Sequence, residues 1–418
     1  MRPLSKLAVP LLGMAAAALP AAPAAASPEA DAALGRALSA QMRFAGPSSG
    51  AFVVNATENR TVLRWRHHTG RVLASNVKLF TTAAALARFG TEGRLGTEVR
   101  GAGQLETDGT WTGDLYLRGG GDPSFGSARF VRRAYGSGAT VEALAAEVEE
   151  AGIERVSGRI YGDESRFDSR RGGPASGYGT SIWVGPLSAM SFNRGLASER
   201  GLSFQRNPAS FAAARLDAAL ERRGVRVARA PRARTTPGGA TLMASVESPT
   251  MARLAQLTNK PSDNFFAEML LKGLGLQATG RGTTARGARV AMAFARGLGS
   301  GARLVDGSGL SYSNRATPFR VTRLLTALLE RDEFEVFDAS LSVAGRDGTL
   351  APRMRRGPAR GRCHGKTGTL TSVSALSGYC RARSGDLYAF SILMNGVSIS
   401  GARRLQDRMA QAMAGVRG

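Results

Sequence analysis

Residues 74–90 read ASNVKLFTTAAALARFG, and this stretch links the fold of the chain to its chemistry. After Ser75 the residues are rich in Ala and Leu and end at Gly90, a pattern typical of a helix closed by glycine. Lys78 follows Ser75 by three positions, so the hydroxyl and the amine lie on one helix face. The stretch therefore predicts a helix N-terminus that presents a serine beside a lysine, where backbone N–H groups stabilise negative charge.

Lysine is scarce in this chain, which makes its use at position 78 informative. Lys occurs only at positions 6, 78, 260, 272 and 366, so 51 of the 56 basic residues are Arg (56 − 5). Arg stays protonated at any working pH, whereas a Lys removed from water can give up its proton and act as a base. We interpret Lys78 as a candidate base for Ser75, although a Ser three residues before one of five Lys arises by chance at a rate of about one in three.

Two other short motifs carry residues of the same chemical types. Ser262-Asp263-Asn264 precedes the apolar stretch FFAEMLL, where the ordinary interpretation is a capped helix start. Lys366-Thr367-Gly368-Thr369 lies on an expected strand, where the ordinary interpretation is a surface strand with a lysine. Glycine weakens a strand interior unless something approaches the backbone closely, and we expect a substrate to do so at Gly368.

The two cysteines flank the third motif. Cys363 and Cys380 border two expected strands around a turn at residues 371–372, and folding symmetrically about that turn sets the cysteines opposite each other. We therefore expect a structural cross-strand disulfide, which suits an oxidising compartment.

The first residues are typical of an export signal. Arg2 and Lys6 precede the apolar run 7–19, and small residues follow at 24–26. We expect residues 1–26 to be removed and the protein to act in the periplasm or the cell-wall space. The apolar run is too short, and too broken by proline, to span a bilayer stably, and no other segment is apolar for long enough.

The organisation of the remaining chain is expected to be discontinuous. Residues 27–96 and 241–418 are expected to form one domain around an insertion of short strands and helices at 97–240. Paired strands are expected at 50–57 and 61–66, whereas 229–239 is expected to be an exposed loop or linker. From about 241 the chain is expected to be mostly helical up to the cysteine hairpin.

The order Ser-x-x-Lys, Ser-Asp-Asn, Lys-Thr-Gly resembles the D-alanyl-D-alanine carboxypeptidase/endopeptidase family of low-molecular-mass penicillin-binding proteins. In that family a large insertion separates the first two motifs, and here the gap is 187 residues (262 − 75). Further similar stretches are GDLYLRGGGDPSF, DGSGLS at 306–311 and AGRDGTL at 344–350.

The resemblance implies an α+β fold. Its catalytic part is a penicillin-binding-protein/serine β-lactamase-like transpeptidase domain, an antiparallel sheet flanked by helices, with an inserted strand-rich second domain. It also implies a serine-type D-Ala-D-Ala carboxypeptidase/endopeptidase that acts on peptidoglycan stem peptides through an acyl-enzyme, is inhibited covalently by β-lactams, and uses neither metal nor organic cofactor.

The same resemblance assigns a role to each motif residue. Ser75 is the nucleophile, Lys78 its base, and Ser262 relays a proton to the leaving amine. Asn264 holds the substrate amide and orients Lys78. Lys366 is the fifth expected catalytic residue, and together with Thr367 it receives the terminal carboxylate. The expected substrate-binding residues are Thr367, Gly368 and Thr369. The backbone N–H groups of Ser75 and Thr369 form the oxyanion hole. Asp122 and Asp163 in the insertion are candidates for recognising the third amino acid of the stem peptide.

Other interpretations of the sequence were weighed. Tyr312-Ser313-Asn314 is similar to the Tyr-x-Asn motif of class C β-lactamases, but it belongs to the stretch DGSGLSYSN, which resembles the carboxypeptidase family as a unit. A class A β-lactamase lacks support because no Glu-bearing loop stands out. The motif Gly46-Pro47-Ser48-Ser49-Gly50 precedes a strand rather than a helix, and the three histidines, 67, 68 and 364, lie in no convincing triad setting.

A non-hydrolytic wall-binding protein is a further alternative, and the charge of the chain bears on it. The formal net charge is +24. Such charge suits an anionic partner, but the arginines are spread along the sequence without an aromatic-rich basic cluster, so we interpret the charge as compositional and expect no nucleic-acid partner.

Overall fold

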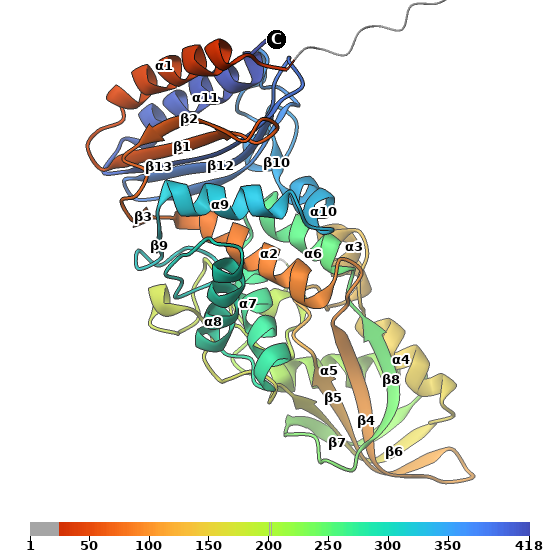
Figure 1. The fold of residues 1–418 in the computed structure, drawn as a ribbon. Coiled ribbons are helices and arrows are strands. Elements are labelled where there is room, and N and C mark those ends of the chain that lie inside the picture. Colours follow the sequence, from red (N-terminus) through yellow and green to blue (C-terminus); the bar gives the residue numbers. More distant parts are fainter. Residues whose placement is uncertain (1–24, 200, 202) are drawn as a thin grey trace, which may run out of the picture.

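A computed structural model describes residues 25–199, 201 and 203–418 of the chain. The expected export signal lies almost entirely outside the described residues. The chain forms two parts, a larger one with a six-stranded sheet and a smaller one with a five-stranded sheet (Figure 1). This arrangement confirms the expected α+β class.

The six-stranded sheet is antiparallel and forms the centre of the larger part. The strand order is β10 (Ser342–Val343), β11 (Cys363–Leu370), β12 (Val373–Arg381), β13 (Leu387–Asn395), β1 (Ser49–Asn55) and β2 (Arg60–Trp65). Helices α1 (Pro28–Arg43) and α11 (Ile399–Gly415) cover one face, and α9 (Pro318–Leu328) packs on the other (Figure 1). The sheet is thus buried on both sides, which explains the nearly continuous burial of β12 and β13.

A helical layer lies beyond α9 and holds most of the apolar core. It consists of α2 (Val77–Phe89), α6 (Met251–Asn259), α7 (Asn264–Thr279), α8 (Thr284–Gly297) and α10 (Phe334–Ser340). Helix α2 ends at Gly90, whose φ of 78° continues no helix, so the expected end of this helix is confirmed. The short strands β3 (Arg71–Val72) and β9 (Arg315–Ala316) pair below the main sheet.

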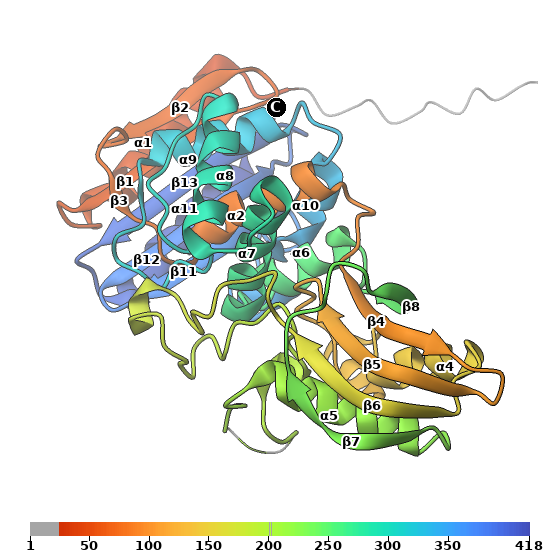
Figure 2. The same cartoon turned by 90° about the horizontal axis from the view of Figure 1, so that it is seen from below.

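The smaller part is the insertion. Its strand order is β7 (Arg226–Ala233), β6 (Arg155–Asp163), β5 (Thr110–Gly119), β4 (Gly96–Leu105) and β8 (Thr241–Glu247). Helices α4 (Val141–Glu150) and α5 (Pro208–Glu221) pack on one face, and α3 (Ala128–Tyr135) lies beside α6 near the junction (Figures 1 and 2). The apolar stripe expected at residues 141–148 is buried in this core.

Two expectations about the insertion differ from the structure. Residues 229–239 were expected to be a loop, but 226–233 form β7, an edge strand rich in arginine that contains Pro231. Charge and proline are typical of edge strands, which explains why the stretch looks like a loop. Strand β8 pairs with β4, so this sheet extends to Glu247, beyond the expected end of the insertion at 240. We therefore place the domain boundary after Glu247.

A long stretch of the insertion without regular strands, residues 164–199, runs back along the larger part. Phe167 packs in the core of the helical layer and forms an isolated bridge with Gly282. The short 3-10 helices at Pro174–Ser176 and Asn193–Gly195 are its main regular elements. Ser176 and Trp183 of this stretch line the same cavity as Ser75, so insertion residues reach the region of the three motifs.

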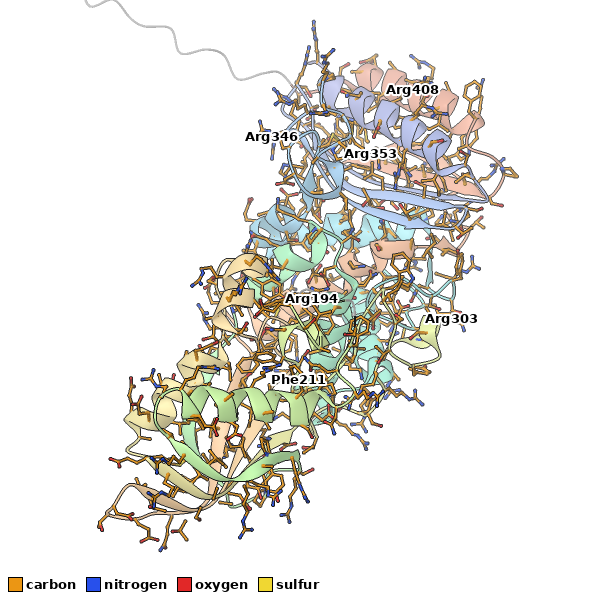
Figure 3. All side chains as sticks on the ribbon, turned by 180° about the vertical axis from the view of Figure 1, so that it is seen from behind. Arg194, Phe211, Arg303, Arg346, Arg353 and Arg408 are labelled. Atoms are coloured by element: carbon orange, nitrogen blue, oxygen red, sulfur yellow. A yellow bond between two sulfur atoms is a disulfide. The ribbon has the colours of Figure 1, made fainter. Side chains whose placement is uncertain are left out.

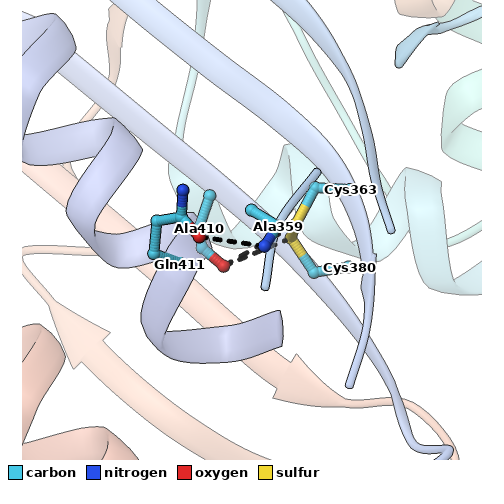
Figure 4. Close-up of a disulfide and its surroundings, with 5 residues drawn as sticks. All are labelled: Ala359, Cys363, Cys380, Ala410 and Gln411. Carbon is cyan, nitrogen blue, oxygen red and sulfur yellow. Dashed lines mark hydrogen bonds between the residues drawn. A yellow bond between two sulfur atoms is a disulfide. The ribbon is translucent and has the colours of Figure 1, made fainter. Parts of the chain in front are cut away.

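The expected disulfide is present. Cys363 and Cys380 are bonded, with Cα atoms 4.0 Å apart, and they are opposite residues in the β11–β12 ladder. The bridge lies against Ala410 in α11, next to the hydrogen bond that the Ala359 N–H donates to the Gln411 side chain (Figure 4). The cross-strand prediction is therefore confirmed.

Removing this bridge is expected to destabilise the fold. We expect Cys363→Ser/Cys380→Ser to lower the free energy of unfolding by about 3 kcal/mol, because the bridge closes a loop with a sequence separation of 17. Lys366 is expected to keep its ladder position opposite Ser377, because the other pairs of the β11–β12 ladder remain. Urea unfolding of the parent and the double variant measures the difference, and an unchanged midpoint contradicts the expectation.

Candidate active site

Ser75 stands on a single 3-10 turn, Ala74–Asn76, directly before α2. Ala74 has a φ of 45°, an unfavourable value for a residue with a side chain. The Asn76 side chain donates a 2.9 Å hydrogen bond to the Lys366 carbonyl, which ties this turn to β11. Ser75 lines a cleft of about 840 Å³ together with Ser262, Asn264, Thr367 and Thr369. The three motifs therefore meet at one cavity, as the sequence predicted.

Lys78 is fully buried and its amine touches three oxygen atoms. Its Nζ atom lies 3.0 Å from Ser75 Oγ, 2.8 Å from Asn264 Oδ1 and 2.6 Å from the Ser308 carbonyl oxygen. Two of these partners accept only, so they fix the amine in place. The Ser75 contact is the one along which a proton can pass, because a neutral amine accepts from the hydroxyl.

Burial changes the charge preference of Lys78. Removal from water lowers its pKa to about 8, against the opposing effect of Asp263, Asp306 and Glu268. The pKa of the nearby buried Lys366 is also lowered, well below its usual value, by burial and by repulsion from Lys78. The neutral form of Lys78 is therefore far more accessible near neutral pH than that of an ordinary lysine, although the protonated form still predominates below about pH 8.

The second motif lies at the start of α7. Asp263 caps the helix, its carboxylate accepting the N–H of Phe266 at 3.0 Å, so the ordinary interpretation of the motif is also correct. Ser262 has a φ of 63°, a strained conformation of the kind found at functional sites, and it lines the cleft. Asn264 is the first residue of α7 and points its amide oxygen at Lys78.

The third motif lies on β11 along the cleft. Lys366 is buried and donates to the Thr367 carbonyl at 2.9 Å, and Thr367 donates to the Thr349 hydroxyl at 2.7 Å. A Cβ atom on Gly368 would lie 2.8 Å from the Leu73 carbonyl oxygen and 3.1 Å from the Ser75 nitrogen. The turn that carries Ser75 is therefore one group that approaches the backbone closely at Gly368.

The loop at 306–311 supports Lys78 in a way that the sequence did not indicate. Glu268, one helical turn after Asn264, accepts the N–H groups of Gly307 and Ser308 at 3.1 and 2.9 Å. Asp306 accepts the N–H groups of Gly309 and Ser311, each at 2.8 Å. Burial raises the pKa of Glu268 to about 7, and it raises that of Asp306 as well. Together these carboxyl groups hold the carbonyl that positions the Lys78 amine.

The insertion supplies part of the cleft wall and braces the second motif. The Trp183 carbonyl accepts from the Asn264 side chain at 3.1 Å, and Trp183 itself is exposed beside the cleft. Arg194, at the junction of the two parts (Figure 3), pairs with Asp263 at 2.7 Å and lies 5.1 Å from the centre of the Phe265 ring. These contacts join residues far apart in sequence, which explains why no motif revealed them.

Several residues considered from the sequence lie elsewhere. Asp122 accepts a hydrogen bond from the Ser124 hydroxyl, and Asp163 accepts one from the Thr236 hydroxyl. Neither aspartate lines the cleft. His364 contacts Asp338 at 2.7 Å, and His67 stacks on Phe52. Tyr312 does line the cleft and donates to the Thr371 carbonyl at 3.2 Å. Within the described residues, no three His, Cys, Asp or Glu side chains gather in a way that could hold a metal ion.

The rate of acylation is expected to depend on pH through Lys78. A base must be neutral to accept the Ser75 proton, and Lys78 has a pKa of about 8. We therefore expect the second-order acylation rate to rise with pH and to be half-maximal close to that value, falling about tenfold per pH unit well below it. Stopped-flow acylation across this range measures the profile, and a rate independent of pH contradicts the assignment of Lys78 as base.

An antiparallel sheet between helical layers, with a serine beside a buried lysine at a helix start, defines a serine acyl-transfer enzyme of the penicillin-binding class. The chain belongs to the D-Ala-D-Ala carboxypeptidase 3 (S13) family, whose model matches residues 31–199 and 193–416. It is a serine-type D-Ala-D-Ala carboxypeptidase, the class that the three motifs indicated.

Individual relatives agree with this placement. Over 451 residues the chain is 30% identical to the D-alanyl-D-alanine carboxypeptidase of an Actinomadura species, covering 88% of this chain and 81% of the relative. Carboxypeptidase DacB of Mycolicibacterium smegmatis is 31% identical over 363 residues, covering 81% and 74%. Among solved structures, penicillin-binding protein 4 of Haemophilus influenzae is similar with a TM-score of 0.75 at 20% identity, covering 89% of this chain and 97% of that one. This likeness confirms the expected fold.

Proposed function

We propose that this enzyme removes the terminal D-alanine from peptidoglycan stem peptides outside the cytoplasm, with Ser75 as nucleophile and Lys78 as base. The observation that carries the proposal is the 3.0 Å contact between the Lys78 amine and the Ser75 hydroxyl, in a cleft that also contains Ser262, Asn264 and the 367–369 strand. No helix among the described residues is long and apolar enough to cross a membrane.

Acylation begins when Lys78 accepts the Ser75 proton and Ser75 Oγ attacks the carbonyl between the two D-alanines. The backbone N–H groups of Ser75 and Thr369 receive the oxyanion. Ser262 relays the proton taken up by Lys78 to the departing amine, the C–N bond breaks, and D-alanine leaves. A water molecule then attacks the ester carbonyl, which releases the shortened peptide and restores the Ser75 hydroxyl.

Substrate binding follows from the residues around the nucleophile. Asn264 holds the substrate amide with its side chain while its oxygen orients Lys78. Lys366 and Thr367 take the terminal carboxylate, and an incoming anion favours the protonated form of Lys366, which burial otherwise disfavours. Gly368 allows β11 to lie close to the Ser75 turn, so the oxyanion donors come from two adjacent segments.

β-Lactams are proposed to acylate the same serine. The Haemophilus influenzae protein of similar fold has been solved in complex with a β-lactam. When Ser75 attacks the amide of a β-lactam, it forms an ester of the same type, and the ring nitrogen is the leaving group. Cutting a D-alanyl cross-link forms the same peptidyl acyl-enzyme as removing a terminal D-alanine. Endopeptidase activity is therefore part of the proposal.

The proposal is tested by product release. The mature protein and its Ser75→Ala variant are incubated with a soluble peptide ending in D-Ala-D-Ala and, separately, with cross-linked muropeptides. We expect free D-alanine from the first, cleaved dimers from the second, and neither product from the variant. Tight retention of the peptides without any product favours the alternative of a non-hydrolytic wall-binding protein.

A further inference from the structure

The sheet of the insertion is covered by helices on one face only (Figures 1 and 2). In β6 the side chains of Val156 and Ile160 point into the covered core. Successive residues of a strand alternate between faces, so Arg155, Arg159 and Tyr161 belong to the opposite, open face. An interior strand thus places two arginines on a face that no helix covers.

The neighbouring edge strand adds further cations to this face. In the β6–β7 ladder, Arg226 lies opposite Arg155 and Arg232 lies opposite Tyr161. Arg234 follows the end of β7, and its guanidinium lies 5.6 Å from the centre of the Tyr161 ring. We call the set Arg155, Arg159, Arg226, Arg232 and Arg234 the arginine face.

The arginine face has no ion pairs of its own. Within residues 25–418, less 200 and 202, no carboxylate oxygen lies within 4.0 Å of a guanidinium nitrogen of these five arginines. Asp108 and Asp114 are the acidic neighbours, and Asp114 accepts the backbone N–H of Arg159 at 2.9 Å. Arginines opposite each other on adjacent strands repel, so this arrangement costs stability unless an anion binds there.

Aromatic contacts hold two of these cations in place. The Arg159 guanidinium lies 5.8 Å from the centre of the Tyr161 ring, and that ring stacks on Tyr116 at 5.2 Å. Cation–π contacts of this kind restrict the side chains before any ligand arrives. The face therefore presents charges that are partly preorganised for an anionic partner.

Protection of a sheet edge does not explain the arginine face. Edge strands often carry charge and proline to prevent pairing with other chains, and β7 has both. Arg155 and Arg159, however, lie on β6, which is paired on both sides by β5 and β7. Their positions require a different reason.

We propose that the arginine face binds the peptidoglycan polymer itself, through the carboxylates of its stem peptides, at a place separate from the catalytic cleft. The choice of peptidoglycan rests on the proposed function, since that polymer must also enter the cleft. A second copy of this chain is a poor partner because both copies are strongly basic, with a net charge of +24 each. Residues 1–24 contain Arg2 and Lys6 and no acidic residue, so they do not complement the face either.

Binding at the arginine face keeps the substrate near the cleft. A polymer held at one point brings its other stem peptides to the active site at a raised effective concentration. The consequence is a lower KM for polymeric peptidoglycan, with no change for a short soluble peptide. This difference separates a binding surface from a contribution to catalysis.

The test compares two variants of equal charge. In a Ser75→Ala background, the five residues of the arginine face are replaced with Gln. In the control variant, five other exposed arginines are replaced with Gln. They form no ion pairs among the described residues, and they lie on α1, α8 and α11 (Arg408 is marked in Figure 3). These five are Arg36, Arg43, Arg289, Arg404 and Arg408. Binding to purified insoluble peptidoglycan, freed of attached phosphate polymers, is measured across salt concentrations.

We expect the arginine-face variant to bind at least about tenfold more weakly, with a smaller salt dependence, while the control variant stays close to the parent. Equal losses in both variants, or none, overturn the proposal. Binding only to walls that retain phosphate polymers overturns the choice of peptidoglycan as the partner.

A catalytic readout shows which proposal has failed. With Ser75 intact, the arginine-face variant is expected to release D-alanine from a short soluble peptide at the parent rate, which also reports that it is folded. Loss of that release in the variant alone contradicts a pure binding role for the face. Absence of release from the parent contradicts the proposed function, irrespective of the binding result.

Discussion

Lys78→Arg is expected to lower the acylation rate constant by at least about a thousandfold, because general-base contributions are commonly of that size. The substitution keeps a positive charge at the site but removes the ability to take up a proton near neutral pH. The amine now lies 3.0 Å from the Ser75 hydroxyl and has a pKa of about 8, whereas a guanidinium stays protonated. The measurement is the rate of acylation by a chromogenic β-lactam under single-turnover conditions.

The matched control for this variant is Lys272→Arg. Lys272 is also fully buried, and its amine pairs with Asp168 at 2.6 Å, a contact that arginine can keep. We expect Lys272→Arg to acylate at close to the parent rate. A Lys78→Arg enzyme that is folded and acylates normally excludes proton transfer to Lys78.

Gly309→Ala is expected to reduce acylation by about a hundredfold or more, although Gly309 touches no substrate in the proposed mechanism. A Cβ atom there would lie 1.9 Å from the Ala74 carbonyl oxygen and 2.9 Å from the Ser75 nitrogen. Backbone cannot yield as a flexible side chain does, so the turn that carries Ser75 must move. Displacements of about 1 Å in a reacting group can cost that much in rate.

The control for Gly309→Ala separates steric displacement from backbone strain. Gly309 has a φ of 87°, and Gly136 has a φ of 85° with nothing within 4 Å of its virtual Cβ atom. In both alanine variants the free energy of unfolding is expected to fall by about 1–2 kcal/mol, because a residue with a side chain is strained at this positive φ. Only Gly309→Ala is expected to slow acylation; equal rates in the two variants contradict the steric explanation.

Local patterns were sufficient for much of the fold. The helix after Ser75 and the hairpin between the cysteines each depend on neighbouring residues, and both are confirmed. Strand β8 was missed because its partner is β4, with Thr241 opposite Gly101. The two strands are far apart in the sequence, so the residue pattern of 241–247 alone does not reveal that they pair.

The candidate site divides in the same way. The motifs predicted that Ser75, Lys78 and Asn264 lie together, because Ser75 and Lys78 share the start of α2 and Asn264 begins α7. Glu268 was missed, although an acidic residue within the apolar stretch FFAEMLL, four positions after Asn264, is a usable signal of a buried role on the same helix face. The bracing of Asp263 by Arg194 carries no comparable signal, because it joins the insertion to α7 across the chain.

The distribution of charge is a third case. Along the sequence the arginines look evenly spread, which favoured a compositional interpretation. The fold places Arg155 and Arg226 side by side, although 71 positions separate them (226 − 155). Strand pairing, rather than sequence clustering, therefore creates the arginine face.

The most direct test of the acyl-enzyme assignment is covalent labelling with a fluorescent penicillin. The mature protein and Ser75→Ala are incubated with the reagent, denatured and separated, and the labelled peptide is located by mass spectrometry. We expect one label per molecule on the peptide that contains Ser75, and none on the variant. A label that persists in Ser75→Ala, or a folded parent that takes no label, contradicts Ser75 as the nucleophile.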